Sequence, residues 1–471
     1  MIRRWHEDGG YRELLKLAIP LVLSTGAWSV QHFVDRMFLS WYSAEAVAAS
    51  MPAGILNFAC MSFFIGTASY VSTFVAQYHG ARRPDRIGPV VWQGVWVGAL
   101  GGLALLALIP AAGPAFRLIG HAPALQRLET VYFRVLCVGA GPAIAASAMA
   151  GFYSGLGRTG TVMWVSIAAT VVNLVLDYGL VFGHWAFPRL GIAGAALATT
   201  LSGVFSLCTY SVLLLSRKYR ALYHTPNWRP QPDLFRRLWR YGAPSGLQFF
   251  VDIAGFSAFV LFVGRLGTEP LAAMSIAFNI NTLAFLPMIG GGIAVSVLVG
   301  QRLGENRAEL AERSTLSGAH LMFLYMGAVS LLYLLWPDLF IRPFGHHANP
   351  VAFAARRRML VVFLRFVALY SLFDTMNIVF ASALKGAGDT RFVMRVVLLM
   401  SLTLLVVPTY VALELFKADI YAAWIIFSAY VILLGFMFYA RFRHGKWKQM
   451  RVIEPAAAFV AAPAPEAPTG V

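Results

Sequence analysis

The segment VAQYHGARR at residues 75–83 returns as VGQRLGENR at residues 299–307, 224 positions further along the chain. Gln77 of the first copy aligns with Gln301 of the second, and the glycine three residues later also matches without a gap. Such a match indicates an internal duplication. The two halves of the chain are therefore expected to share one architecture.

The correspondence continues toward the end of each half with a small change of offset. GLGRT at 155–159 corresponds to GAGDT at 386–390, 231 positions apart. We attribute the shift of seven residues to a longer outer loop near residues 340–350. Because this glycine motif recurs at equivalent positions, we interpret it as a tight turn rather than as a nucleotide-binding loop.

The composition is that of a membrane protein. Of the 471 residues, 59% are hydrophobic and 13% are charged, and the mean hydropathy is +0.67. Soluble proteins carry about 25% charged residues. Apolar segments long enough to cross about 30 Å of hydrocarbon recur along the whole chain. They fall at residues 14–41, 46–78, 88–113, 125–155, 161–183, 191–216, 236–265, 270–302, 312–336, 352–385, 392–415 and 420–441.

The sequence therefore predicts an all-α membrane protein with twelve transmembrane helices. Because six is even, both halves have the same topology, which gives a parallel repeat about an axis normal to the membrane. We expect two six-helix lobes that form a V around a central cavity. The predicted divisions are an N-lobe at 1–216, a basic cytoplasmic linker at 217–240, a C-lobe at 241–445 and a disordered tail at 446–471.

An even number of spans puts both termini on one side of the membrane, and most of the 38 basic residues fall on that side. The positive-inside rule then predicts a multi-pass protein of the cell inner membrane with both termini in the cytoplasm. This asymmetry accounts for the formal charge of +17 without a nucleic-acid partner. One segment, ARRRM at 355–359, conflicts with the rule because it falls on the predicted outside.

Four carboxylates lie deep within predicted spans, where a charge surrounded by lipid is costly. They are Asp35, Asp177, Asp252 and Asp374. Under the repeat, none of them has an acidic counterpart in the other half. We interpret them as residues with a specific task rather than as elements of helix packing.

Each carboxylate has a polar residue four positions earlier, which places both side chains on one face of a helix. These partners are Gln31, Asn173, Gln248 and Tyr370, and Asn377 extends the last face. Such faces are expected to point toward a cavity or toward each other, because lipid offers no hydrogen-bond partners. Thr199 is included as a further supporting residue.

A desolvated carboxylate flanked by oxygen atoms binds either a proton or a hard cation. The predicted coupling and substrate residues are Asp35, Asn173, Asp177, Asp252, Tyr370 and Asp374. The coupling ion is predicted to be H⁺ or Na⁺, with Na⁺ at Asp35/Asn173/Asp177 or at Tyr370/Asp374. No other metal, no cofactor and no catalytic residue is predicted, because the known catalytic and nucleotide-binding motifs are absent.

Pro20 and Pro244 occupy matching places in the first helix of each half. Proline removes a backbone hydrogen bond and kinks a helix. In both helices the proline precedes the candidate aspartate by several turns. We predict that these two positions act as hinges.

At this point the chain resembles a known family, the multidrug and toxic compound extrusion (MATE) family. The resemblance is carried by FVDRMFLSWYSAEAVAA, VAQYHGARR with VGQRLGENR, GLGRTGT, VNLVLDYGLVFG and ASALKGAGDTR. It extends from about residue 11 to residue 445. It implies a V-shaped fold of twelve helices and the efflux of mostly cationic, amphipathic compounds driven by inward H⁺ or Na⁺.

The resemblance also implies roles for individual positions. Asp35 matches the carboxylate in helix 1 of the family, and Asn173 with Asp177 matches the first-lobe site of the DinF-like branch. Asp252 matches the helix 7 carboxylate of the NorM-like branch, and Tyr370 with Asp374 matches the helix 10 site of that branch. This chain departs from both patterns by holding both sets, by having Asp rather than Glu at 252, and by having Arg36 where a smaller residue is expected.

The prediction is thus a secondary antiporter, not an enzyme, that acts in the lipid bilayer as a monomer. It would export small organic, cationic substrates by alternating access of the two lobes. One alternative is a flippase for lipid-linked saccharides, which would need a strongly cationic cavity. The other is a membrane-embedded hydrolase that uses an aspartate pair such as Asp35 with Asp177.

Overall fold

The computed structural model describes residues 5–345 and 350–454, and this part of the chain is entirely helical apart from its connections. The long helices of the first half are α1 (Tyr11–Tyr42), α2 (Ala44–Ser69), α3 (Val71–Gly80), α4 (Ile87–Ala107), α6 (Pro123–Gly155), α7 (Thr159–Phe182) and α8 (Ile192–Leu214). Those of the second half are α10 (Pro232–Gly264), α11 (Thr268–Gly304), α12 (Ala308–Leu335), α14 (Pro350–Ala387), α15 (Thr390–Met400) and α17 (Ile420–Arg443).

Short helical segments complete these elements. They are η2 (Pro84–Arg86), η3 (Ile109–Ala111), α5 (Ala112–Ile119), α9 (Arg217–Tyr223), α13 (Pro337–Ile341), η4 (Arg342–Gly345), α16 (Val407–Tyr410) and η7 (Lys446–Gln449). Two π-helical segments, η5 (Ser401–Val406) and η6 (Val411–Leu415), flank α16 and its Pro408, as expected where proline interrupts the normal bonding. Among the described residues, twelve helical spans are long and apolar enough to cross a membrane, which confirms the predicted fold class.

The boundaries of the helices follow from local sequence. Ser43 caps α2 because its hydroxyl accepts a hydrogen bond from the Ala46 amide at 3.0 Å. Asp419 caps α17 in the same way, through the Ala422 amide at 3.2 Å. Gly183 ends α7 in a left-handed conformation with a φ of 79°, which glycine adopts without strain.

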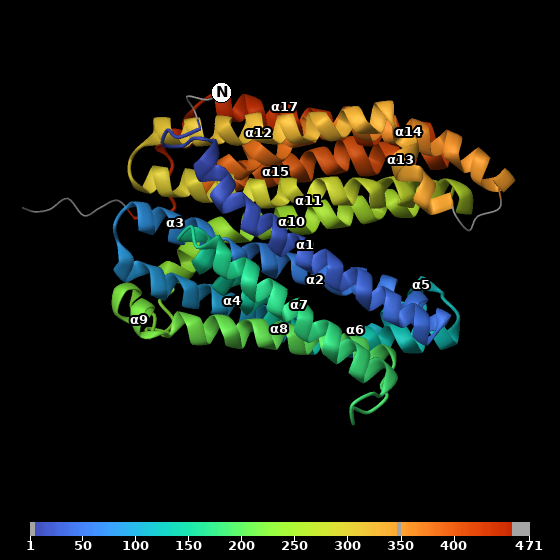
Figure 1. The fold of residues 1–471 in the computed structure, drawn as a ribbon, viewed down its shortest axis with the longest axis horizontal. Helices are drawn as coiled ribbons and strands as arrows, with labels where there is room; N and C mark the ends of the chain where they lie inside the picture. The colour runs from blue at the N-terminus through green and yellow to red at the C-terminus, as the bar shows by residue number, and fades with distance from the viewer. Residues whose placement is uncertain (1–4, 346–349, 455–471) are drawn as a thin grey trace, which may run out of the picture.

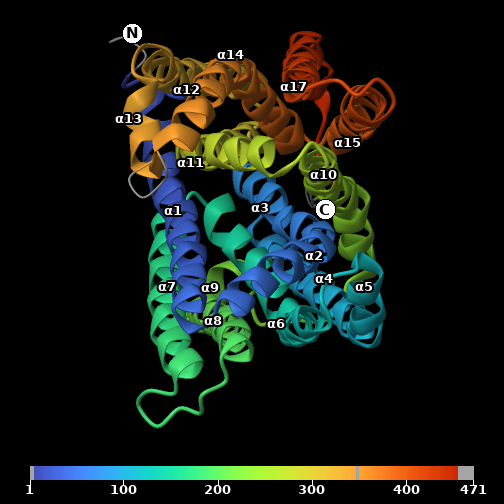
Figure 2. The ribbon, with the colours of Figure 1, turned by 90° about the vertical axis from the view of Figure 1, so that its right-hand side faces the viewer.

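The same helix pairings occur in both halves. In the first half α6 packs against α2, α4 and α8, and in the second half α14 packs against α11, α12 and α17. The first helix of each half contacts both halves. Helix α1 packs on α7 of its own half and on α11 of the second half, and α10 packs on α15 of its own half and on α2 of the first half. Figures 1 and 2 show the resulting two lobes, blue to green and yellow to red.

The two lobes lie close together at one end of the molecule and spread apart toward the other (Figure 1). We call the end that carries Gly80, Gly304 and the chain after α17 the closed end, and the end that carries α5 and α13 the open end. At the closed end the backbones touch: a Cβ atom on Gly80 would lie only 2.0 Å from the carbonyl oxygen of Gln301. Glycine is required there because no side chain fits.

Two predicted boundaries differ from the structure. The linker predicted at 217–240 contains α9 and the first turns of α10, because Pro232 already begins that helix. The tail predicted as disordered from 446 instead forms η7 and a segment that packs onto the closed end as far as Glu454. Trp447 is fully buried there and stacks on Phe442, with ring centroids 4.9 Å apart. Residues 455–471 lie outside the described part of the chain.

Candidate functional site

The first-lobe carboxylates come together from two helices. Asp35 of α1 and Asp177 of α7 have exposed fractions of 5% and 0%, and their carboxyl groups lie close enough to interact directly. In one orientation of its side-chain amide, Asn173 forms hydrogen bonds with two neighbours. Its nitrogen donates to Asp35 Oδ1 at 2.9 Å, and its oxygen accepts from the Thr199 backbone amide at 3.3 Å. The structure therefore unites four of the predicted residues in one cluster.

Asn173 links the two helices of this cluster. The sequence placed Asn173 beside Asp177 on one helix face, yet the amide of Asn173 reaches across to Asp35. Within the described part of the chain, neither oxygen of Asp177 has a hydrogen-bond donor. A fully buried carboxyl group without donors is costly unless it holds a proton or a cation.

Other residues surround the pair without bonding to it. Gln31, one turn before Asp35, is buried, and the Thr199 hydroxyl donates to its own helix at Ala195 rather than to a carboxylate. Tyr132 of α6, which the sequence did not single out, lies within electrostatic range of both carboxyl groups. Arg36 is exposed and forms no ion pair with any residue that the structure describes.

The second-lobe carboxylate Asp252 lies in α10 and is linked to a lysine through an amide. Gln248 donates from Nε2 to Asp252 Oδ2 at 2.6 Å, which confirms that these two residues share a face. The Gln248 oxygen accepts a hydrogen bond from Lys385 Nζ at 3.3 Å. Lys385 lies in the last turn of α14, at the end of the predicted span 352–385. Asp252 is therefore linked to a lysine through one amide side chain.

Asp374 of α14 is stabilised by its own helix. Asn377 donates to Asp374 Oδ1 at 3.0 Å, as the spacing of three residues suggests. Tyr370, predicted to accompany Asp374, instead accepts from Asn281 Nδ2 of α11 at 3.3 Å. Its ring lies against Trp424, which is fully buried. The structure thus assigns the hydroxyl of Tyr370 to packing between helices.

The closed end is joined by two equivalent hydrogen bonds between the lobes. Gln77 Nε2 donates to the Gly386 carbonyl oxygen at 3.0 Å, and Gln301 Nε2 donates to the Gly155 carbonyl oxygen at 2.8 Å. All four residues are paired by the sequence repeat. Among the residues that the structure describes, Gln77 alone of the two glutamines has a further partner, because its oxygen accepts from the Val452 amide at 2.8 Å.

The segment after α17 bridges the lobes at this end. Glu454 accepts from the hydroxyl of Tyr78 at 2.7 Å and from Arg86 at 3.0 Å, both in the first half. Burial alone would raise the pKa of Glu454. The bond from Tyr78 and the charges of Arg83 and Arg86 outweigh this effect, so the pKa lies below its usual value.

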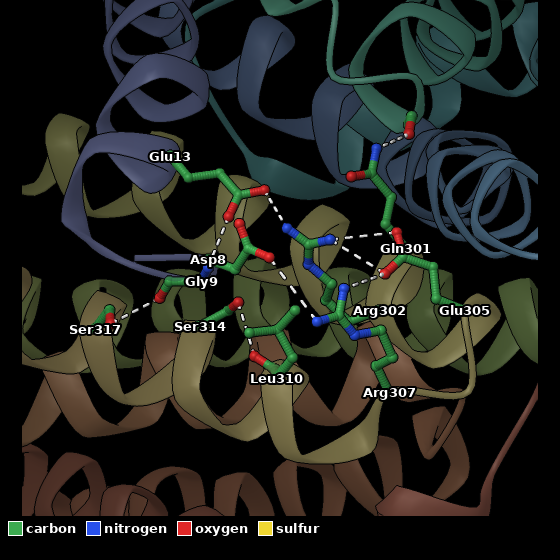
Figure 3. A network of polar contacts seen from close by, with 11 residues as sticks. Asp8, Gly9, Glu13, Gln301, Arg302, Glu305, Arg307, Leu310, Ser314 and Ser317 are labelled. Atoms are coloured by element: carbon green, nitrogen blue, oxygen red, sulfur yellow. Dashed lines mark hydrogen bonds and ion pairs between the residues drawn. The ribbon is translucent and has the colours of Figure 1, made fainter. Parts of the chain in front are cut away.

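A second network ties the residues before α1 to the second lobe, as Figure 3 shows. Glu13 pairs with Arg302 at 2.5 Å, and Asp8 approaches Arg307 at 3.8 Å. The Ser317 hydroxyl donates to the Gly9 carbonyl oxygen at 2.8 Å. Both ends of the described chain thus reinforce contacts at the closed end.

The arginines that conflicted with the charge rule, within ARRRM at 355–359, are paired inside the protein at the open end. Arg356 bonds Glu269 at 3.0 and 2.8 Å, and Arg357 bonds Asp338 at 2.7 and 2.5 Å. The bond from Arg357 holds the pKa of Asp338 below its usual value. Local ion pairs therefore account for these two arginines without any other partner.

Comparisons with known proteins agree with this architecture. The MatE family model matches residues 20–179 and 244–411, which lie in the two lobes. A protein of Bradyrhizobium diazoefficiens named probable multidrug resistance protein NorM is 30% identical over 391 residues, which cover 82% of this chain and 83% of that protein. The protein of the same name from Synechocystis is 28% identical over 392 residues, which cover 81% and 83% of the two chains.

Solved structures share the fold. A transporter of the MOP superfamily from Pyrococcus furiosus has a TM-score of 0.83 with 19% identity, over 95% of this chain and 99% of that one. A structure described as the outward-facing conformation of a multidrug resistance MATE family transporter has a TM-score of 0.83 with 20% identity, over 95% of this chain and 99% of that one. At these identities the likeness concerns the fold alone.

Proposed function

Because the chain belongs to the MatE family of multidrug efflux transporters, we propose that it is an antiporter that exports small organic cations in exchange for H⁺ or Na⁺. Family membership makes the protein a multi-pass membrane transporter rather than an enzyme. The nature of the substrates, the exchange mechanism and the coupling ion are parts of the proposal.

The observation that carries the proposal is the state of Asp177. It is fully buried, faces the carboxyl group of Asp35, and has no hydrogen-bond donor on either oxygen within the described residues. Two carboxyl groups this close cannot both be charged at low cost, so the pair favours a shared proton or a bound cation. Release of that ion would leave an unstable pair of charges, which gives the driving force for a change of conformation.

The donor set suits a small hard cation as well as a proton. Asp35 and Asp177 supply carboxylate oxygens, which Na⁺ prefers over nitrogen or sulfur ligands. Asn173, in the orientation given above, donates a hydrogen bond to Asp35 and so supports that carboxylate. Among the described residues, no cluster of three or more His, Cys, Asp or Glu side chains is placed so that it could hold a metal ion. We therefore propose a monovalent ion at this site.

We place the coupling site in the first lobe rather than the second. Asp252 and Asp374 each accept a hydrogen bond from a side-chain amide, at 2.6 and 3.0 Å. Lys385 also approaches Asp252 through Gln248. These partners stabilise the charged carboxylates without an added ion. We propose that the second-lobe carboxylates contribute to the recognition of a cationic substrate.

We propose that the closed end faces the cytoplasm of the inner membrane, so the described conformation opens outward. The basic residues of η2, α9 and the start of α10 gather at this end, as the positive-inside rule requires. Both lobes belong to one chain, which allows a monomer to alternate access by moving one lobe against the other. Pro20 and Pro244 lie inside continuous helices that cross between the lobes, where a hinge would act.

Transport assays in liposomes test the proposal. An imposed proton or Na⁺ gradient should drive export of a fluorescent organic cation by the wild type, and the ion that supports export identifies the coupling ion. Asp177→Asn and Asp35→Asn should reduce export to the level of empty liposomes. Asp338→Asn provides the matched control, because it removes a half-buried carboxylate at the open end whose ion pair, among the described residues, is with Arg357.

The same assay separates the two alternatives raised by the sequence. Export that continues without any ion gradient, or that survives in both Asp177→Asn and Asp35→Asn, would contradict the antiport mechanism. A flippase would move a lipid-linked saccharide between leaflets in these liposomes. A hydrolase using Asp35 and Asp177 would release a cleaved product, which mass spectrometry of the substrate would detect.

A further inference from the structure

A basic pocket lies at the closed end, away from the buried carboxylates. Its volume is about 760 Å³. Five arginines line it: Arg86 of η2, Arg236, Arg237 and Arg240 of α10, and Arg391 of α15. Two carboxylates, Asp233 and Glu454, also line it, so the formal charge of the lining is +3. Three elements far apart in the sequence therefore converge to build one positively charged concavity.

The arginines differ in what they already bind. Arg86 pairs with Glu454, and Arg237 donates to the Val452 carbonyl oxygen at 3.3 Å. Arg236 and Arg391 are exposed and form no hydrogen bond or ion pair with any residue that the structure describes. Arginine offers five donors in a planar fork that matches phosphate oxygens. Arg236 and Arg391 are thus available to bind an anion, and Arg240, which is also exposed, lies over the Tyr241 ring at 5.7 Å.

Local helix geometry adds to the positive potential. Both α10, which begins at Pro232, and α15, which begins at Thr390, have their N-terminal ends at the pocket. Helix N-termini attract anions because their first amides are unpaired and the helix dipole is positive there. Asp389, which precedes α15, does not offset this attraction, because its carboxylate binds Arg441 at 2.7 Å instead.

Aromatic side chains place the pocket at the level of the lipid headgroups. Trp239 and Tyr241 line it, and Trp239 is 39% exposed. The Trp239 ring stacks on Phe235 and meets Phe63 of the first lobe, both with centroids 6.1 Å apart. Tryptophan and tyrosine concentrate where a membrane protein crosses the headgroup region. The helices that line the pocket belong to the spans Pro232–Gly264 and Thr390–Leu415, which are long and apolar enough to cross a membrane, so the pocket lies at the ends of two spans.

From these observations we propose that the pocket binds the phosphate groups of an anionic phospholipid. Arg236 and Arg391 would contact the phosphate oxygens, and Trp239 would lie beside the glycerol and the upper acyl chains. The positive-inside rule explains basic residues at this end in general, but it does not explain their convergence on one pocket beside an exposed tryptophan. Because the bound lipid would contact η2 and α10 at once, it would join the lobes at the closed end.

Native mass spectrometry of the purified full chain in detergent tests this site. Phosphatidylglycerol and cardiolipin should bind, and phosphatidylcholine should bind at least about tenfold more weakly. The double variant Arg236→Gln/Arg391→Gln should lower affinity for the anionic lipids about tenfold. The control is Arg220→Gln/Arg443→Gln, which removes the same charge from exposed, unpaired positions of α9 and α17 among the described residues.

Three results would overturn the proposal. The first is equal affinity for phosphatidylglycerol and phosphatidylcholine. The second is equal loss of lipid binding in the pocket variant and the control variant. The third is tight binding of inorganic pyrophosphate together with its displacement of lipid, which would assign the site to a soluble phosphate compound. Unfolding temperatures of both variants should match that of the wild type, because neither removes a described contact.

Discussion

Gln77 and Gln301, which occupy equivalent positions in the two halves, each donate a hydrogen bond to the backbone of the opposite half, at Gly386 and Gly155. The bonds are related by the internal repeat, so the duplication built the closed end from two copies of one contact. The segment after α17 breaks this symmetry, because Val452 donates to Gln77 and no equivalent contact to the Gln301 oxygen occurs among the described residues.

This asymmetry predicts unequal effects of two matching substitutions. Gln77→Ala removes two hydrogen bonds at a fully buried site and should destabilise the closed end by about 2–3 kcal/mol, whereas Gln301→Ala should cost about 1–2 kcal/mol. Distances between spin labels on α3 and α11 would show how far each variant populates a state with this end open. Equal shifts in both variants would mean that the contact with Val452 contributes nothing.

The glycines beside these glutamines should tolerate no side chain. A Cβ atom on Gly80 would lie 2.0 Å from the Gln301 carbonyl oxygen, and one on Gly304 would lie 2.2 Å from the Gln77 carbonyl oxygen. Since backbone atoms cannot move aside cheaply, Gly80→Ala and Gly304→Ala should each force the lobes apart at the closed end. Thiol accessibility of a cysteine placed in this interface would report the opening.

A matched control for these variants is Gly160→Ala. This helical glycine has no neighbouring atom within 4 Å of the added Cβ, so the change should be neutral or slightly stabilising. If Gly80→Ala left the interface as protected as Gly160→Ala does, the close approach of the lobes described above would be wrong.

The docking of the segment that ends at Glu454 should depend on pH. The folded-state pKa of Glu454 is lowered, so its carboxylate stabilises docking above its unfolded-state pKa, and this contribution is lost as pH falls through the lowered folded-state value. The protection of residues 446–454 against hydrogen exchange, measured relative to the intrinsic exchange rate at each pH, should therefore fall at acidic pH. Glu454→Gln should raise exchange at neutral pH and remove this pH dependence, and an unchanged profile would contradict the assignment.

Lys385 should matter for stability as well as for the charge of the second lobe. Lys385→Met leaves the oxygen of Gln248 without its donor and Asp252 without a nearby cation, so we expect a loss of about 1–3 kcal/mol. Adding Asp252→Asn should recover part of this loss, because the carboxylate that needs the cation is gone. Thermal unfolding measures both effects, with Lys218→Met on α9 as the exposed control.

If the double variant Lys385→Met/Asp252→Asn were no more stable than Lys385→Met alone, the charge of Lys385 would not be stabilising the Asp252 carboxylate. The side chain of Lys385 would then act through its hydrogen bond to Gln248, separately from the contact made by the backbone of Lys385. That backbone already accepts a hydrogen bond from the Tyr70 hydroxyl of the first lobe at 2.7 Å.

Most of the fold could be predicted from local patterns. Apolar segments marked all twelve spans because a helix in lipid must satisfy its backbone internally and needs a fixed length. The spacing of four residues correctly placed Gln248 beside Asp252. Spacing did not indicate the hydrogen-bond partners of Asn173 and Tyr370, because Asp35 and Asn281 lie on other helices. Periodicity within one helix carries no information about the rotation of its neighbour.

The sequence by itself determined the class of protein, the number of spans, the duplication and the four carboxylates within spans on which the proposal rests, because these depend on composition and on spacing within one helix. Only the tertiary structure decided that Asp35 meets Asp177, that Lys385 reaches Gln248, and that the chain ending at Glu454 joins the two lobes. Each of these contacts joins residues more than a hundred positions apart. The packing of helices against one another, which no local pattern encodes, brings them together.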